Sequence, residues 1–68
     1  MKVSLKALRV NAGLNQKEAA KQLGITEKTM QNWESSETFP TAQQLMRICT
    51  IYNCTLNDIF LPDKLAKS

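Results

Sequence analysis

Histidine is absent from this sequence of 68 residues, and cysteine, glycine and proline occur only twice each. Without histidine, a Cys/His zinc site is excluded, and Cys49 and Cys54 alone do not complete the ligand set of a structural zinc ion. Two cysteines are also too few for the disulfide framework of a small secreted protein. We therefore expect no metal, no cofactor and thiols that stay reduced.

Long hydrophobic runs are missing as well. Residues 1–6 lack the apolar stretch of a signal peptide, and no apolar segment reaches the length that crosses a bilayer. The acidic residues are scattered, and there is neither a glycine-rich phosphate loop nor a nucleophile elbow. These absences predict a cytoplasmic protein that is not an enzyme and has no membrane partner.

The chain is long enough for one domain, which we expect to span residues 1–68 with a core at 4–61 and a polar tail at 62–68. Nine basic residues face six acidic ones, a net charge of +3. Six of the nine basic residues lie within the first 28 positions. This uneven placement favours an anionic partner, although charge alone does not separate nucleic acid from a membrane or an acidic protein.

Five segments begin with a polar N-cap candidate and continue with apolar residues at helical spacing. The caps are Ser4, Asn15, Thr26, Thr41 and Thr55. No segment shows the strict alternation of a half-buried strand. The pattern predicts an all-α fold of five short helices around one core.

Three residues are expected to end helices, because each tolerates a left-handed backbone: Gly13, Gly24 and Asn53. The inner faces combine small and large apolar side chains. Those expected to face the core are Leu5, Leu8, Ala12, Ala19, Ala20, Leu23, Met30, Trp33, Leu45, Ile48, Cys49, Tyr52, Leu56, Ile59 and Phe60.

The segment 16–34 meets the demands of a helix-turn-helix, in which two short helices cross at a tight turn. Ala20 is small where the helices approach each other, and Gly24 follows four positions later, where the turn needs a positive φ. Ile25 supplies the apolar residue that fills the turn from below.

This segment resembles the helix-turn-helix of the phage Cro/C1-type repressor family, also called the XRE family. The resemblance continues through Trp33-Glu34, Pro40 and the apolar pattern from Leu45 to Phe60, so that it covers about residues 5–61. It implies a lambda-repressor-like DNA-binding domain. The expected role is a transcriptional regulator, in particular a repressor, that binds double-stranded DNA at a two-fold related operator as a homodimer.

With Met30 and Trp33 inward, the helical repeat places other side chains of 27–35 on the outer face. The resemblance implies that this helix contacts base edges. The candidates for base contacts are Glu27, Lys28, Thr29, Gln31 and Asn32. Each could instead be a solvated surface residue, and Glu27 could serve the helix dipole.

For the DNA backbone, the candidates are Gln16, Lys17 and Thr38. The resemblance further implies a structural ion pair between Arg9 and Glu34. The loop 35–39 departs from the family pattern, because it contains no basic residue and one acid, Glu37. Weak attraction to phosphate in this loop makes a second copy of the chain more important.

The candidate dimer surface is the C-terminal part, residues 56–65. Two alternatives to a regulator remain open. The chain could be an antitoxin that uses the same fold to mask a toxin partner, or a module that binds only protein.

Overall fold

The computed structural model describes residues 3–59. These form four α-helices and one 3₁₀ turn: α1 (Leu5–Asn11), α2 (Gln16–Leu23), α3 (Glu27–Glu34), α4 (Ala42–Tyr52) and η1 (Leu56–Asp58). The predicted all-α class is confirmed. The predicted tail at 62–68 and the predicted core residue Phe60 lie outside the described residues.

The fifth predicted helix is instead the single 3₁₀ turn η1. The Asp58 carboxylate accepts hydrogen bonds from the backbone N–H of Thr55 at 3.0 Å and from its hydroxyl at 3.1 Å, and these bonds lower the pKa of Asp58. Directly afterwards, Ile59 is extended and forms an isolated parallel bridge with Val3. The Val3 N–H donates to the Asp58 carbonyl at 2.7 Å. This pairing of Ile59 with Val3 takes the place of a further helical turn at Ile59.

Each α-helix begins at the polar residue that the sequence predicts. The Ser4 side chain accepts the Ala7 N–H, and the Thr26 side chain accepts the Thr29 N–H. The caps of α2 and α4 are complete capping boxes, in which the N-cap and the residue three positions later exchange side-chain bonds to backbone N–H groups. Local side-chain chemistry therefore sets these starts.

Two residues expected in the core lie outside it: Ala12, and Leu56, which is 50% exposed in η1. Because α1 ends at Asn11, Ala12 is its C-cap and is exposed. The chain then turns at Gly13, whose φ is +78°, and the Leu14 N–H returns to the Arg9 carbonyl. The inward face of α1 therefore stops a turn earlier than predicted.

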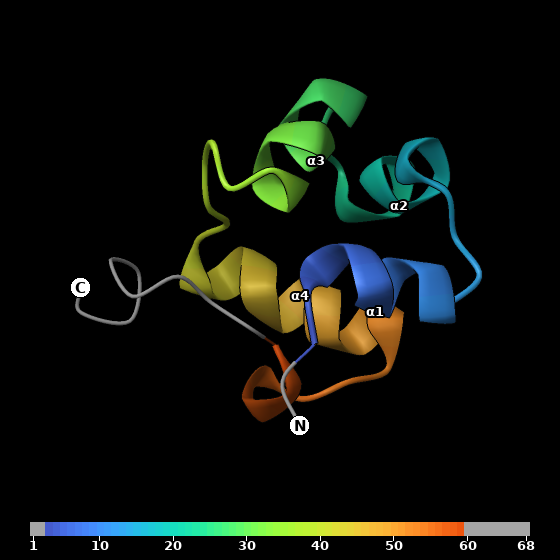
Figure 1. Cartoon of the computed structure of the whole chain (residues 1–68), viewed down its shortest axis with the longest axis vertical. Helices are drawn as coiled ribbons and strands as arrows, with labels where there is room; N and C mark the ends of the chain where they lie inside the picture. Colours follow the sequence, from blue (N-terminus) through green and yellow to red (C-terminus); the bar gives the residue numbers. More distant parts are fainter. Residues whose placement is uncertain (1–2, 60–68) are drawn as a thin grey trace.

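The core lies where the four helices meet. In Figure 1, α2 and α3 lie together above α1 and α4. The buried apolar side chains are Leu8, Ala19, Ala20, Leu23, Met30, Trp33, Leu45, Ile48, Tyr52 and Ile59.

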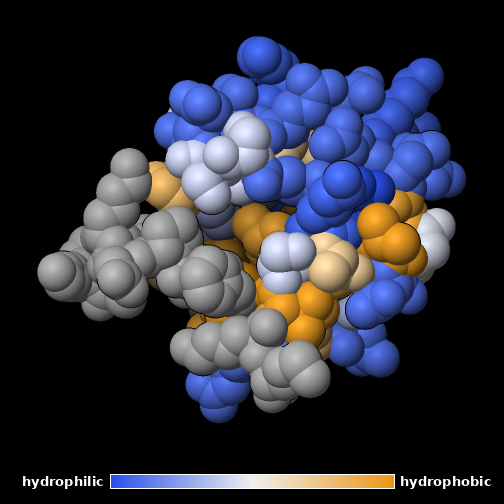
Figure 2. Space-filling view, in the orientation of Figure 1, coloured by the Kyte–Doolittle hydropathy of each residue, from blue (hydrophilic) through white to orange (hydrophobic). Residues whose placement is uncertain are grey.

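The two pairs of helices differ in surface character. Figure 2 shows hydrophilic residues over the upper part of the molecule, where α2 and α3 lie, and hydrophobic residues gathered lower down near α1 and α4. Three large apolar side chains among the described residues are strongly exposed: Val10 in α1, Met46 in α4 and Leu56 in η1. None of these belongs to α2 or α3, which present a polar outer surface.

Candidate nucleic-acid interface

The turn between α2 and α3 is built from three residues. Gly24 takes the left-handed conformation, with φ 73° and ψ 30°. The Ile25 N–H donates to the Ala20 carbonyl at 3.0 Å, and Ile25 is half-buried against the core. Ala20 is 3% exposed. A larger side chain at this point would push the two helices apart, since both sides of the contact are already closely packed.

Helix α3 is amphipathic, with an apolar face against the core and a polar face toward the outside. Met30 and Trp33 are buried on its inner side. Glu27, Lys28 and Gln31 are exposed. The inner contacts thus fix the rotation of α3 and leave a polar outer face available to a partner.

The first turn of α3 is braced by two threonines. The Thr26 hydroxyl accepts the Thr29 N–H at 3.1 Å, and the two threonine hydroxyls lie 2.9 Å apart. Thr29 is half-buried. Its hydroxyl is thus engaged in the helix cap rather than free for a partner.

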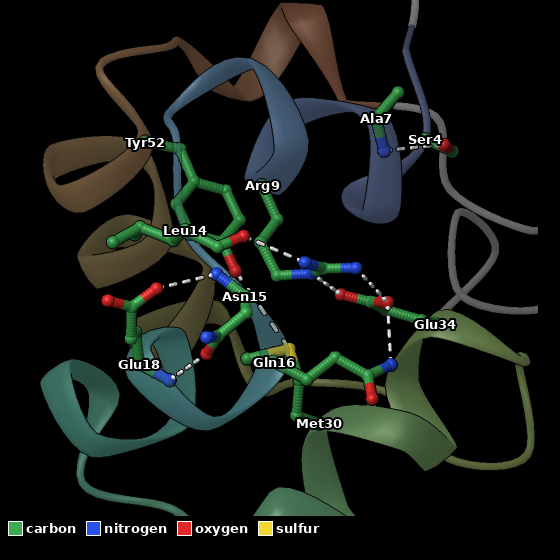
Figure 3. Close-up of polar contacts among 10 residues, drawn as sticks. All are labelled: Ser4, Ala7, Arg9, Leu14, Asn15, Gln16, Glu18, Met30, Glu34 and Tyr52. Carbon is green, nitrogen blue, oxygen red and sulfur yellow. Dashed lines mark hydrogen bonds and ion pairs between the residues drawn. The ribbon is translucent and has the colours of Figure 1, made fainter.

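A charged network joins α3 to α1 and to the start of α2 (Figure 3). Arg9 Nε donates to Glu34 Oε2 at 2.7 Å, and a second guanidinium nitrogen donates to Oε1 at 3.3 Å. The Gln16 amide also donates to Oε1, at 3.1 Å. Both charged side chains are nearly inaccessible, with 9% and 5% of their surface exposed. This network fixes α3 against two other helices.

The environment of the network reinforces it. The remaining guanidinium nitrogen of Arg9 donates to the Leu14 carbonyl at 2.8 Å, in the link between α1 and α2. The hydrogen bond to Glu34 raises the pKa of Arg9. Burial, and then the nearby charge of Glu34, raise the pKa of Tyr52 to about 12. The Tyr52 hydroxyl makes a long contact of 3.9 Å to the Met30 sulfur, which links α4 to α3.

The loop after α3 folds back on the helix end. The backbone N–H groups of Glu37 and Thr38 both donate to the Asn32 carbonyl, at 2.9 and 3.3 Å. Ser36 has a positive φ of 66°, and its N–H donates to the Trp33 carbonyl at 3.3 Å. Asn32 is half-buried, whereas the helical repeat alone predicts it on the open outer face. The amides of this loop are consequently used internally.

The predicted backbone contacts are distributed unevenly. Lys17 and Thr38 are exposed. Gln16 is half-buried and already donates to Glu34. The Gln16 side chain therefore braces α3 in this structure.

Three features of the site were not found by sequence reasoning. They are the position of Tyr52 beside the charged network, the Arg9 bond to the Leu14 carbonyl, and the loop bonds to the Asn32 carbonyl. A tyrosine in an apolar stripe carries no sequence signal for such a role.

Among the described residues 3–59, no three His, Cys, Asp or Glu side chains gather in a way that could hold a metal ion. Within the same range, every helix is too short or too polar to span a bilayer.

Comparison with known proteins agrees with this geometry. A helix-turn-helix family model matches residues 5–59. The chain is also similar to the HTH-type transcriptional regulator ImmR of Bacillus subtilis (strain 168), with 32% identity over 63 residues. That match covers 93% of this chain and 50% of ImmR, so the chain spans about half the length of this relative. The chain belongs to the Cro/C1-type (XRE) family of helix-turn-helix DNA-binding transcriptional regulators.

Proposed function

We propose that this chain binds double-stranded DNA with sequence specificity, with α3 in the major groove, and represses transcription at a two-fold related operator. The observation that carries the proposal is the polar outer face of α3, which stands opposite a fully buried inner face. An α-helix fits the major groove, where each base pair presents its own pattern of donors and acceptors. In this role residues 1–68 act as one domain in the cytoplasm and catalyse no reaction.

Each predicted base contact has a suited target. Lys28 donates to guanine O6 and N7, Asn32 pairs with adenine, and Glu27 accepts from cytosine N4. Because the Thr29 hydroxyl is engaged with Thr26, the Thr29 methyl group is the part left for a base contact. Its target is the methyl group of thymine. Gln31 lies exposed on the same face and is the fifth contact.

Contacts to phosphate come from Gln16, Lys17 and Thr38 in this proposal. Because the loop amides of Glu37 and Thr38 are bound to the Asn32 carbonyl, the loop offers phosphate a hydroxyl rather than a cradle of N–H groups. Few neutralised phosphates give weak and salt-sensitive binding. A dimer compensates by doubling the contacts, with recognition helices about 34–36 Å apart.

The dimer surface that we propose is the segment 56–65, whose described part begins with Leu56, 50% exposed. Sedimentation of the protein with its operator tests this. The expected species contains two chains for each operator, and a single chain bound to the full operator would contradict the dimer.

The central experiment is selection of bound sequences from a random pool of double-stranded DNA at two salt concentrations. We expect one enriched two-fold related sequence. On that sequence, Lys28→Glu should lower affinity by roughly 100-fold, since it replaces a base contact by a repelled charge. Lys21→Glu is the matched control: it makes the same charge change at an exposed position of α2 and should cost less than about tenfold.

Two outcomes would contradict the proposal. Equal losses for the two variants would mean that α3 does not contact the bases. If no DNA sequence is enriched, the alternative gains support, namely an antitoxin or another protein-interaction module on the same fold.

A further inference from the structure

Cys49 lies in the last turn of α4, and Cys54 directly follows its C-cap, Asn53. They are free, and both are half-buried rather than enclosed. Neither takes part in the charged network or in the turn of the helix-turn-helix. The DNA-binding role leaves both thiols unused. They lie close together in sequence at the end of α4.

The end of α4 is left-handed, and its geometry brings the two residues together. Asn53 ends α4 with φ 54° and ψ 53°. The Cys54 N–H then donates to the Cys49 carbonyl at 2.9 Å, which is the closing bond of a Schellman helix end. In this motif the side chains at the two bonded positions commonly contact each other. The conformation of Asn53 thus sets one thiol beside the other.

The electrostatics agree with this proximity. Burial, followed by the neighbouring Cys49 thiol through its charge and a hydrogen bond, raises the pKa of Cys54 to about 11. Cys54 also lines an open hollow of about 480 Å³ between the ends of α1 and α4 and the turn η1, together with Asn11, Tyr52 and Asp58. A small reagent can therefore reach Cys54 through this hollow.

We propose that Cys49 and Cys54 form a dithiol site that exchanges with small-molecule disulfides of the glutathione class. One thiolate attacks the reagent, forms a mixed disulfide and releases one reagent thiol. The second cysteine loses its proton and attacks the sulfur of the first, which releases the second reagent thiol. The protein dithiol is oxidised to an intramolecular disulfide, and one molecule of reagent disulfide is reduced to two thiols.

The test is equilibration of the whole chain with mixtures of reduced and oxidised glutathione, in native buffer and in concentrated urea. Acid quenching, alkylation and mass spectrometry then measure the fraction with a Cys49–Cys54 disulfide. Because the folded helix end holds the thiols together, we expect the effective thiol concentration to be at least about tenfold higher in native buffer than in urea. An equal or lower native value would overturn the proposal without any variant.

A matched variant separates this geometry from mere closeness in sequence. Cys54→Ser combined with Leu56→Cys keeps two thiols but moves one to a strongly exposed position on η1. Circular dichroism is the control that checks whether this variant keeps its helices. Its native effective concentration should fall close to the urea value. If it matches that of the original chain, the helix end does not create the site.

Discussion

The two halves of the molecule differ in the side chains that they bury and in the surface that they expose. The half made of α2 and α3 buries two alanines, a leucine, a methionine and a tryptophan, and it presents an almost wholly polar surface (Figure 2). The half made of α1 and α4 buries two leucines, an isoleucine and a tyrosine, and it leaves Val10 and Met46 exposed. The small residues let α2 and α3 cross closely, whereas α1 and α4 supply much of the apolar burial that stabilises so short a chain.

The halves are joined by polar as well as apolar contacts. Glu34 of α3 is bound by Arg9 of α1, and Tyr52 of α4 contacts Met30 of α3. A polar recognition half thus depends for its orientation on the half below it. Changes in the lower half should affect stability, and changes on the upper outer face should affect DNA binding alone.

The largest expected effect comes from the lower half. Ile48 is 1% exposed in α4, so Ile48→Ala should lower the free energy of unfolding by about 3 to 4 kcal/mol through lost transfer energy and the cavity left behind. Urea unfolding measures this loss. Met46→Ala, at a position that is 64% exposed on the same helix, is the control and should cost less than about 0.5 kcal/mol.

Next comes the link between the halves. Arg9→Ala leaves the Glu34 carboxylate nearly buried without its cation and should lower the free energy of unfolding by about 3 kcal/mol. Arg47→Ala serves as control, because Arg47 is exposed and makes one long bond of 3.4 Å to the Gln22 carbonyl. The pair Arg9→Met with Glu34→Leu should recover much of the loss. If the double variant recovers none of the lost free energy, apolar side chains cannot replace the stabilisation that the Arg9–Glu34 ion pair provides.

Tyr52 makes the same link sensitive to alkali. Its pKa is raised from 10.0 to about 12, so the folded state holds the proton more tightly than the unfolded state. The stabilisation is complete below pH 10 and is lost as the pH rises to 12, by roughly 1.4 kcal/mol for each pH unit. Urea unfolding at a series of pH values measures the slope. Tyr52→Phe should reduce the slope between pH 10 and 12. An unchanged slope would mean that other groups cause the loss of stability.

The smallest effect lies in the loop after α3. Ser36 has a positive φ of 66°, which costs a side chain energy that glycine avoids. Ser36→Gly should therefore raise the free energy of unfolding by about 0.5 kcal/mol, since the greater freedom of glycine in the unfolded chain offsets part of the relief. Asn53→Gly is the comparison and should change stability less, because asparagine tolerates this conformation. Destabilisation by Ser36→Gly would mean that the serine side chain supports the loop.

Much of the fold follows from local sequence. Ser4, Asn15, Thr26 and Thr41 cap helices where the pattern predicts them, because a cap depends on a side chain and the backbone of the next turn. The last predicted helix is only a 3₁₀ turn after its predicted cap, Thr55, because the bridge between Val3 and Ile59 joins residues far apart in the chain. The early end of α1 also escaped prediction, since Ala12 fits a helix as well as a cap.

By itself, the sequence determined the starts of the helices, the glycine turn at Gly24 and the inner face of α3, since these depend on neighbours a few residues away. Only the tertiary structure decided that Gln16 turns to Glu34, that Tyr52 lies beside the Arg9–Glu34 ion pair, and that the loop amides bond to the Asn32 carbonyl. Each of these contacts depends on where whole helices or loops come to rest against one another. Periodicity and capping signals specify which face is buried, but not which polar side chains meet at its edge.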